Sequence, residues 1–179
     1  AAVSDHDVRI LDMRFDGRLD RALSGFRPDL VGITAYTCDY HVAIAVLKEV
    51  KKFDPRIKTA VGGHHATVLP DDFARPFVDV IFLGAADDSF REFVARSGSG
   101  RPAEEVPNIA FVKDGALHFT DRVPAAQNLD LLPFPDRRLT RAYRDRYRDR
   151  MNNKTGLVMT SRGCPFRCAF CACWKIMDG

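Results

Sequence analysis

Residues 28–35 carry the clearest signal of the fold class and read Pro28-Asp29-Leu30-Val31-Gly32-Ile33-Thr34-Ala35. Its apolar run has no polar alternation, so it predicts a strand that is buried on both faces, as in the interior of a parallel sheet. Apolar residues at helical spacing precede it over residues 19–26. They also follow it over residues 42–53, which predicts a second helix. Thr37 or Asp39 is the candidate cap at the start of this helix. The predicted stripe of this second helix is Val42, Val46, Leu47, Val50 and Phe53.

Further segments continue the same alternation along the chain. Strands are predicted at residues 8–12, at 58–61 before Gly62-Gly63, and at 78–84. A short helical start is expected at 70–73, and Asp87 or Ser89 is expected to cap a helix that carries Phe90 and Phe93. Strands that alternate with helices through short joints predict an α/β fold with a doubly wound parallel sheet over residues 1–100.

The pattern changes after residue 100. Two short apolar segments flank Asp114-Gly115, which is a strong hairpin signal. Residues 124–136 contain three prolines and predict an extended connector, and residues 137–154 are rich in arginine. A new apolar strand is expected at 156–160. The chain is thus divided into residues 1–100, a hairpin and linker over 101–154, and a second unit beginning at 155.

Composition excludes several classes of protein. The net charge of +3 over 179 residues is too small to indicate a nucleic-acid partner, and no apolar run approaches the length of a membrane span. The arginine-rich stretch also contains aspartates, so a solvated surface is favoured over an RNA contact. The adjacent His64 and His65 are more typical of hydrogen-bonded or solvated histidines than of metal ligands. Three of the five cysteines lie close together, which indicates a metal site in a reducing, cytoplasmic compartment.

The candidate metal ligands are Cys164, Cys168 and Cys171, within the run Ser161-Arg162-Gly163-Cys164-Pro165-Phe166-Arg167-Cys168-Ala169-Phe170-Cys171. Three thiolates on one loop can hold three irons of a four-iron, four-sulfur cluster and leave the fourth iron open to a substrate. The alternatives are a zinc site and a chance group of inert thiols. Zinc would require Cys173 as the fourth ligand, and four ligands in ten residues would crowd a tetrahedral site.

With a Gly before the first Cys, a Pro after it and a Phe before the last, this loop resembles the cluster loop of the radical S-adenosylmethionine enzymes. The resemblance implies that the three cysteines bind a [4Fe-4S] cluster, that S-adenosylmethionine chelates the open iron, and that Phe170 packs beside the cluster or the adenine. It also implies that residues 156–160 form the first strand of an incomplete (β/α) barrel. An electron donor such as flavodoxin or ferredoxin would be required. The eight residues after Cys171 cannot enclose such a site, so the 179-residue chain by itself is expected to be inactive.

Residues 8–96 resemble the flavodoxin-like cobalamin-binding domain that precedes many radical S-adenosylmethionine domains. The resemblance implies that Thr34 and Tyr36 lie beside the nucleotide tail of cobalamin, that Gly62 and Gly63 admit the tail, and that His65 lies near the cofactor. Without the resemblance these residues are a weak signal, because glycine pairs often form simple tight turns.

The chain departs from the family pattern in three places. The first strand and helix of the family are expected before Val8, and they are missing or reduced to residues 1–7. Asp39-Tyr40-His41 imitates a cobalt-binding loop, but Ile44 replaces its glycine and it follows the wrong strand, so no imidazole ligand to cobalt is expected. Finally, Gly84-Ala85-Ala86-Asp87 stands where a Gly-Glu-Gly-Glu stretch is usual, and Asp87 or Asp88 would replace the lost carboxylates only in part.

The function expected from these resemblances is that of a cobalamin-dependent radical S-adenosylmethionine methyltransferase. It would act on an unactivated carbon of a lipid, hopanoid, tetrapyrrole or other small molecule. A radical cyclase or rearrangement enzyme with the same cofactors is the first alternative, and a non-catalytic cobalamin- or metal-binding module is the second. No side chain of this chain is assigned as a catalytic acid, base or nucleophile.

Overall fold

Five strands form one open sheet in the order β1-β2-β3-β4-β5 in the computed structural model, which describes residues 6–124 and 128–176. The strands β1 (Leu30–Thr34), β2 (Lys58–Gly62) and β3 (Val80–Phe82) are parallel. The strands β4 (Ile109–Lys113) and β5 (Ala116–Phe119) continue the sheet in antiparallel orientation. The predicted α/β fold with a mostly parallel sheet is therefore confirmed.

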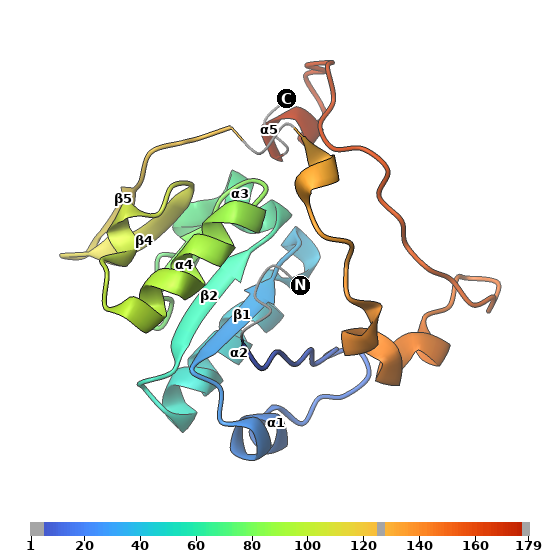
Figure 1. The fold of residues 1–179 in the computed structure, drawn as a ribbon, viewed down its shortest axis with the longest axis horizontal. Helices are drawn as coiled ribbons and strands as arrows, with labels where there is room; N and C mark the ends of the chain where they lie inside the picture. Colours follow the sequence, from blue (N-terminus) through green and yellow to red (C-terminus); the bar gives the residue numbers. More distant parts are fainter. Residues whose placement is uncertain (1–5, 125–127, 177–179) are drawn as a thin grey trace.

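Helices cover both faces of this sheet (Figure 1). The helices α1 (Leu19–Phe26), α2 (Tyr40–Phe53) and α3 (His64–Val68) are connected to β1 and β2, and α4 (Asp87–Ser99) lies on the opposite face. Successive strand residues alternate between the two sides: Val61 and Ile81 pack with α2 and α3, whereas Ala60 and Phe82 pack with α4. This alternation explains why the central residues of β2 and β3 are buried on both faces. The same prediction for β1 is wrong: β1 lies at the edge of the sheet, none of its residues is fully buried, and Gly32 and Thr34 are exposed.

The helix α2 buries a slightly different stripe from the predicted one. Val46, Leu47 and Val50 are buried as expected, but Val42 and Phe53 are about half exposed, and Ala43 is buried instead. Neither Thr37 nor Asp39 caps the helix with its side chain, because a 3₁₀ helix over Thr37–Asp39 precedes it and supplies the first turn.

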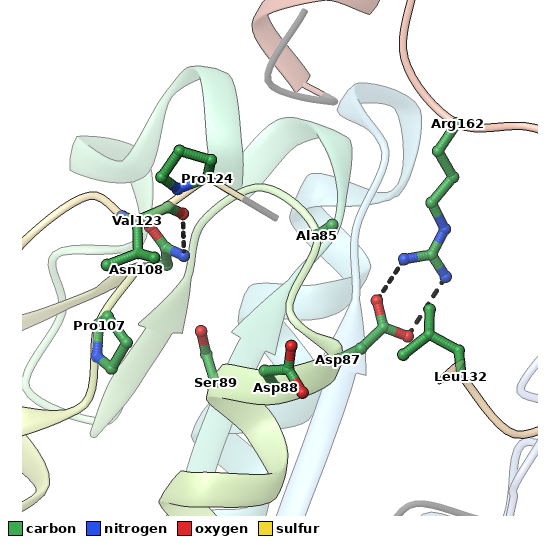
Figure 2. A pocket seen from close by; sticks show the side chains of 10 residues that line it. All are labelled: Ala85, Asp87, Asp88, Ser89, Pro107, Asn108, Val123, Pro124, Leu132 and Arg162. Carbon is green, nitrogen blue, oxygen red and sulfur yellow. Dashed lines mark hydrogen bonds and ion pairs between the residues drawn. The ribbon is translucent and has the colours of Figure 1, made fainter. Parts of the chain in front are cut away.

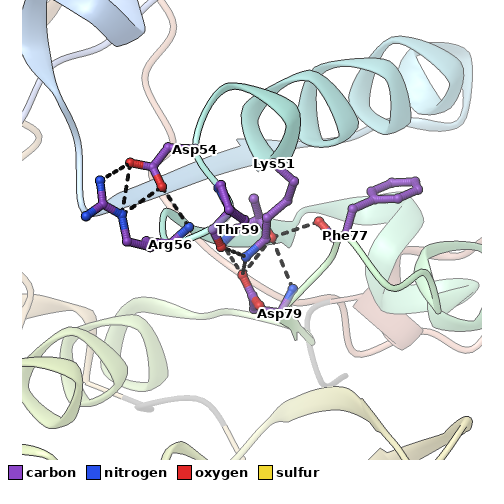
Figure 3. Close-up of polar contacts among 7 residues, drawn as sticks. Lys51, Asp54, Arg56, Thr59, Phe77 and Asp79 are labelled. Atoms are coloured by element: carbon purple, nitrogen blue, oxygen red, sulfur yellow. Dashed lines mark hydrogen bonds and ion pairs between the residues drawn. The ribbon is translucent and has the colours of Figure 1, made fainter.

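A polar network joins β2, β3 and α2 at the amino ends of the strands (Figure 3). Asp79 accepts hydrogen bonds from the backbone N–H and hydroxyl of the fully buried Thr59, at 2.7 and 2.9 Å, and pairs with Lys51 Nζ at 2.6 Å. Burial raises the pKa of Asp79, but the hydrogen bonds from Lys51 and Thr59 together outweigh it, and the pKa is lowered from its usual value. The network thus fixes one end of the sheet, opposite the carboxyl ends of the strands.

The hairpin predicted around Asp114-Gly115 is confirmed. Both residues adopt positive φ, at 53° and 79°, as a two-residue hairpin turn requires. The pairing of β4 with β3, with Ile81 opposite Ala110, is a contact that the sequence pattern does not reveal.

Two predicted strands are wrong. Residues 8–12 form no strand, and β1 is the edge of the sheet, so no neighbouring strand in the described part of the chain offers them hydrogen bonds. Residues 156–160 also form no strand, because no strand in the described part of the chain lies beside them. Leu157 and Val158 are accordingly 83% and 72% exposed. The expected remnant of the family's first strand, at residues 1–7, lies almost entirely outside the described residues.

The C-terminal segment leaves the sheet and forms a long arc beside it (Figure 1). It contains 3₁₀ helices over Leu129–Leu131 and Arg137–Arg146 and ends with a short helix α5 (Cys173–Ile176), which lies next to α3. No helix in the described parts of the chain is both long enough and apolar enough to cross a membrane.

This arc is held to the α/β domain at a contact that we call the aromatic clamp, formed by Asp12, Phe15, Tyr143, Arg146 and Tyr147. The Phe15 ring lies 6.1 Å from the Tyr143 ring and 5.7 Å from the Tyr147 ring, and the Arg146 guanidinium lies 4.4 Å above it. The Tyr147 hydroxyl donates to Asp12 at 3.1 Å. The clamp therefore joins segments that are more than 130 residues apart in the sequence.

Candidate functional site

The carboxyl ends of β1 and β2 meet closely at Gly63. The Ala35 N–H donates to the Gly62 carbonyl at 3.0 Å, and the His65 N–H donates to the Ala35 carbonyl at 3.0 Å. Gly63 has a φ of +94°, and a Cβ at this position would lie 2.5 Å from the Thr34 hydroxyl oxygen. Because glycine lacks a Cβ and tolerates positive φ, Gly63 can approach Thr34 this closely. The structure thus brings Thr34, Gly62 and Gly63 together, and their predicted contact with a cofactor stays a prediction.

A threonine that sequence analysis missed ties together the ends of β2 and β3. The Thr67 hydroxyl donates to the Gly63 carbonyl at 2.9 Å and accepts from the Gly84 N–H at 2.9 Å. Thr67 lies in α3, which the sequence pattern does not predict because the helix has only five residues. Gly63 and Gly84 are consequently held side by side at the carboxyl ends of β2 and β3.

Tyr36 and His64 form a flat aromatic surface at the same edge. Their rings stack at 4.7 Å with an interplanar angle of 17°, and Tyr36 is 51% exposed. A stacked pair of this kind is a suitable wall for a large planar ligand.

His65 points inward, away from this surface. Its ring is 5% exposed, and its nitrogens contact the Thr37 hydroxyl at 3.0 Å and Asp72 Oδ2 at 2.9 Å. The rings of Tyr40 and Phe73 pack around it. In this arrangement His65 holds α3 to its neighbours, and its predicted contact with a cofactor stays a prediction.

A hollow of about 190 Å³ lies between this edge and the C-terminal segment. Glycines and a flat histidine line one side, whereas the side chains that bracket the cysteine loop line the other; its residues are Gly63, His64, Gly84, Ala85, Asp87, Met159, Arg162 and Ile176. Pockets for whole organic ligands usually measure about 300–1,000 Å³. At about 190 Å³, the hollow can therefore enclose only a part of a large organic ligand.

A second hollow of about 70 Å³ adjoins the first around the beginning of α4 (Figure 2). Its far wall is fixed by Asn108, whose side chain exchanges two hydrogen bonds with the backbone of Val123, at 2.7 and 2.9 Å. Asp87 and Arg162 line both hollows.

Asp87 and Arg162 form an ion pair across 75 residues of sequence. Both guanidinium Nη atoms engage the carboxylate, and the longer of the two contacts measures 3.2 Å. The hydrogen bond from Arg162 to Asp87 raises the pKa of the Arg162 guanidinium. Asp87 was expected to cap α4 or to replace a lost carboxylate; its side chain does not cap the helix. Sequence analysis did not single out Arg162, although it stands two residues before Cys164.

The three predicted metal ligands lie on one loop, and none of them forms a disulfide. The loop turns through a hydrogen bond from the Cys171 N–H to the Cys168 carbonyl, at 3.1 Å, and Trp174 Nε1 donates to the same carbonyl at 3.4 Å. Among residues 6–124 and 128–176, no three side chains of the metal-binding types are gathered around one point. The donor chemistry of the loop fits an iron–sulfur cluster, and the ligand assignment stays a prediction. The side chain of Phe170, which was predicted to pack beside the cluster or the adenine, is 94% exposed, and this role stays a prediction.

Comparison with known proteins assigns the family. Residues 1–94 match the model of the B12 binding domain. The chain is 32% identical over 175 residues to the uncharacterized methyltransferase PH0819 of Pyrococcus horikoshii, covering 94% of this chain and 37% of that protein. It is 30% identical to the anaerobic magnesium-protoporphyrin IX monomethyl ester cyclase of Rubrivivax gelatinosus, covering 86% of this chain and 28% of the cyclase.

A solved structure shares the fold over almost the whole chain. It is the radical S-adenosylmethionine methyltransferase TsrM from Kitasatospora setae, with cobalamin and a [4Fe-4S] cluster bound; it superposes with a TM-score of 0.67 at 18% identity, covering 98% of this chain and 38% of TsrM. The chain thus spans between about a quarter and two fifths of the length of these three proteins. The chain belongs to the B12 binding domain family.

Proposed function

We propose that this chain is the cofactor-binding part of a cobalamin-dependent radical S-adenosylmethionine methyltransferase. The observation that carries the proposal is the hollow shared by two distant segments. Gly63 and Gly84 of the α/β domain line it from one side, and Met159 and Arg162, just before the cysteine loop, line it from the other. This shared lining supports the proposal, because the protein's part in such chemistry is to hold and orient its cofactors near one another.

The described residues would divide the work as follows. Cys164, Cys168 and Cys171 would hold the cluster. Tyr36 and Thr34 would line the cobalamin site, with Gly62 and Gly63 leaving room for its tail. When bound, the cluster would supply the electron for reductive cleavage of S-adenosylmethionine, and cobalamin would supply the methyl group.

The alternative is a radical cyclase with the same cofactors. It is supported by the similarity to the magnesium-protoporphyrin IX monomethyl ester cyclase, and the residues described here are compatible with both reactions. Under either reaction the substrate is a small molecule, which we expect to be lipid-like or a tetrapyrrole. The electron donor would be a flavodoxin or ferredoxin of the cytoplasm.

The test is anaerobic reconstitution of the longer protein that contains this chain, with iron, sulfide and cobalamin. We expect a reduced-cluster EPR signal that shifts when S-adenosylmethionine is added and that is absent in a Cys164→Ala variant. Cys173→Ala is the matched control and should keep the signal. If the protein bound zinc in place of iron and retained no cobalamin, the proposed enzyme would be ruled out and the non-catalytic binding module would be favoured.

A further inference from the structure

We propose that Asp87 and Arg162 are positioning residues: their ion pair, which we call the latch, holds the cysteine loop against the carboxyl edge of the sheet. The proposal rests on the proposed function, because seating the loop is useful only if the two sites cooperate. Asp87 is the first residue of α4, and Arg162 lies in the strand-less stretch that leads into the loop (Figure 2).

The geometry makes this pair stronger than an ordinary surface ion pair. The side chains of Arg162 and Asp87 are only 30% and 39% exposed, so water and salt screen them less than fully exposed charges. Both guanidinium Nη atoms engage the carboxylate, which fixes the direction as well as the separation of the two groups. The carboxylate also lies in the first turn of a 13-residue helix, where a negative charge is favoured.

The latch acts directly on the first cluster ligand. Arg162 is separated from Cys164 by one glycine, and two residues of chain reach at most about 7 Å. Fixing the Arg162 side chain on α4 therefore restricts where Cys164 can lie relative to β2 and β3. Apolar contacts from Met159 and Ile176 to the same hollow help to seat the loop, but they do not fix its direction.

The first test needs no cofactor. Hydrogen exchange is measured on peptides covering residues 161–176, in which the amides of Cys171, Lys175 and Ile176 are hydrogen-bonded. The 179-residue chain is used, as the wild type and as Asp87→Asn. The variant should exchange about two to five times faster in these peptides, the range expected for loss of a partly exposed ion pair, with no change in β2 and β3. Raising the salt concentration should accelerate the wild type toward the variant and leave the variant unchanged.

The matched control is Asp88→Asn, which removes the neighbouring carboxylate and its local pair with Arg91. It should exchange like the wild type. Arg162→Gln and the double variant Asp87→Asn/Arg162→Gln complete a cycle, in which the double variant should be no faster than either single variant. If Asp87→Asn and Arg162→Gln exchanged at the wild-type rate, the latch proposal would be wrong. Additive effects in the double variant would also contradict it.

A second test uses the reconstituted longer protein. EPR coupling between the reduced cluster and cob(II)alamin reports their separation. Asp87→Asn should retain full iron and cobalamin content but give a changed coupling, and Asp87→Glu should restore it. Unchanged coupling in a loaded Asp87→Asn protein would contradict the latch. A wild type that binds neither cofactor would contradict the proposed function, while the exchange experiment would still decide whether the latch exists.

Discussion

At the scale of single residues, the sharpest constraint is the close contact between Gly63 and Thr34. In a Gly63→Ala variant the added methyl group would lie 2.5 Å from Thr34 Oγ1, on a backbone with a φ of +94°. We expect the free energy of unfolding to fall by about 3 kcal/mol, from backbone strain and the clash together. Urea denaturation measures this change.

Gly62 provides the control for this prediction. A Cβ on Gly62 would lie 3.4 Å from the Phe82 Cβ, an ordinary contact, and its φ is not positive. Gly62→Ala should therefore cost less than about 1 kcal/mol. Equal losses in the two variants would show that the contact with Thr34 does not limit residue 63.

The two adjacent histidines are also expected to differ in how much stability is lost when each is replaced. His65 is buried and hydrogen-bonded at both nitrogens, whereas His64 stacks on the exposed Tyr36. His65→Ala should lower the free energy of unfolding by about 2–3 kcal/mol, because it opens a cavity and leaves Thr37 and Asp72 without this partner. His64→Ala should cost less than about 1 kcal/mol. Thermal unfolding of both variants tests this, and a reversed order would mean that His65 is not the packed residue.

At the scale of elements, the network at the amino ends of the strands links α2 to β2 and β3. Asp79→Ala would leave the largely buried Lys51 without its carboxylate and the Thr59 N–H without its side-chain acceptor. We expect a loss of about 2–4 kcal/mol in the free energy of unfolding. Glu49→Ala on the same helix is the control; it removes an exposed pair with Lys52 and should cost less than about 1 kcal/mol. Similar losses in the two variants would show that burial does not strengthen the Asp79 network.

The aromatic clamp is predicted to loosen in acid. The hydrogen bond from Arg14 holds the pKa of Asp12 at about 2, against about 3.9 in an unfolded chain. A carboxylate with a lowered pKa stabilises the fold fully above the unfolded pKa and loses this contribution as the pH falls through the folded pKa. The contact between Phe15 and Tyr147 should therefore weaken as the pH falls from about 4 to about 2. NMR of the aromatic ring protons measures this change.

Asp136 is a matched control for the acid prediction. It forms the same Asp-x-Arg turn, with Arg138, and its pKa is likewise about 2, but it makes no contact across to the clamp. Asp12→Asn should abolish the change in ring signals between pH 4 and 2, whereas Asp136→Asn should leave it intact. A change that survives Asp12→Asn would assign the acid sensitivity to another group.

At the scale of the whole molecule, the buried core and the C-terminal arc are separate. Every buried side chain of the described residues lies between Leu23 and Ala110. A chain that ends at residue 124 should therefore unfold cooperatively, with a midpoint lowered by about 5 °C or less through loss of the surface contacts of the clamp. Thermal unfolding followed by circular dichroism tests this. Loss of the cooperative transition would show that the arc is part of the core.

Much of this architecture is readable from local sequence. The apolar run from Leu30 to Ile33 predicts a strand, and Asp114-Gly115 can adopt the positive φ values of a hairpin turn, so these elements follow from a few adjacent residues. The burial of β1 does not follow from its composition, because β1 lies at the edge of the sheet. The cysteine loop is equally local, because its chemistry depends on the spacing of three thiols along the chain. Family membership likewise rests on such short patterns in a fixed order.

Other features depend on a partner far along the chain, and local sequence does not reveal them. Residues 156–160 have the composition of a strand but form none, because a strand needs a neighbour for its hydrogen bonds. His65 is a packing residue because Asp72 and Phe73 fold back onto it. The pairing of Arg162 with Asp87 depends on the path of 75 intervening residues, and no local pattern encodes such a path.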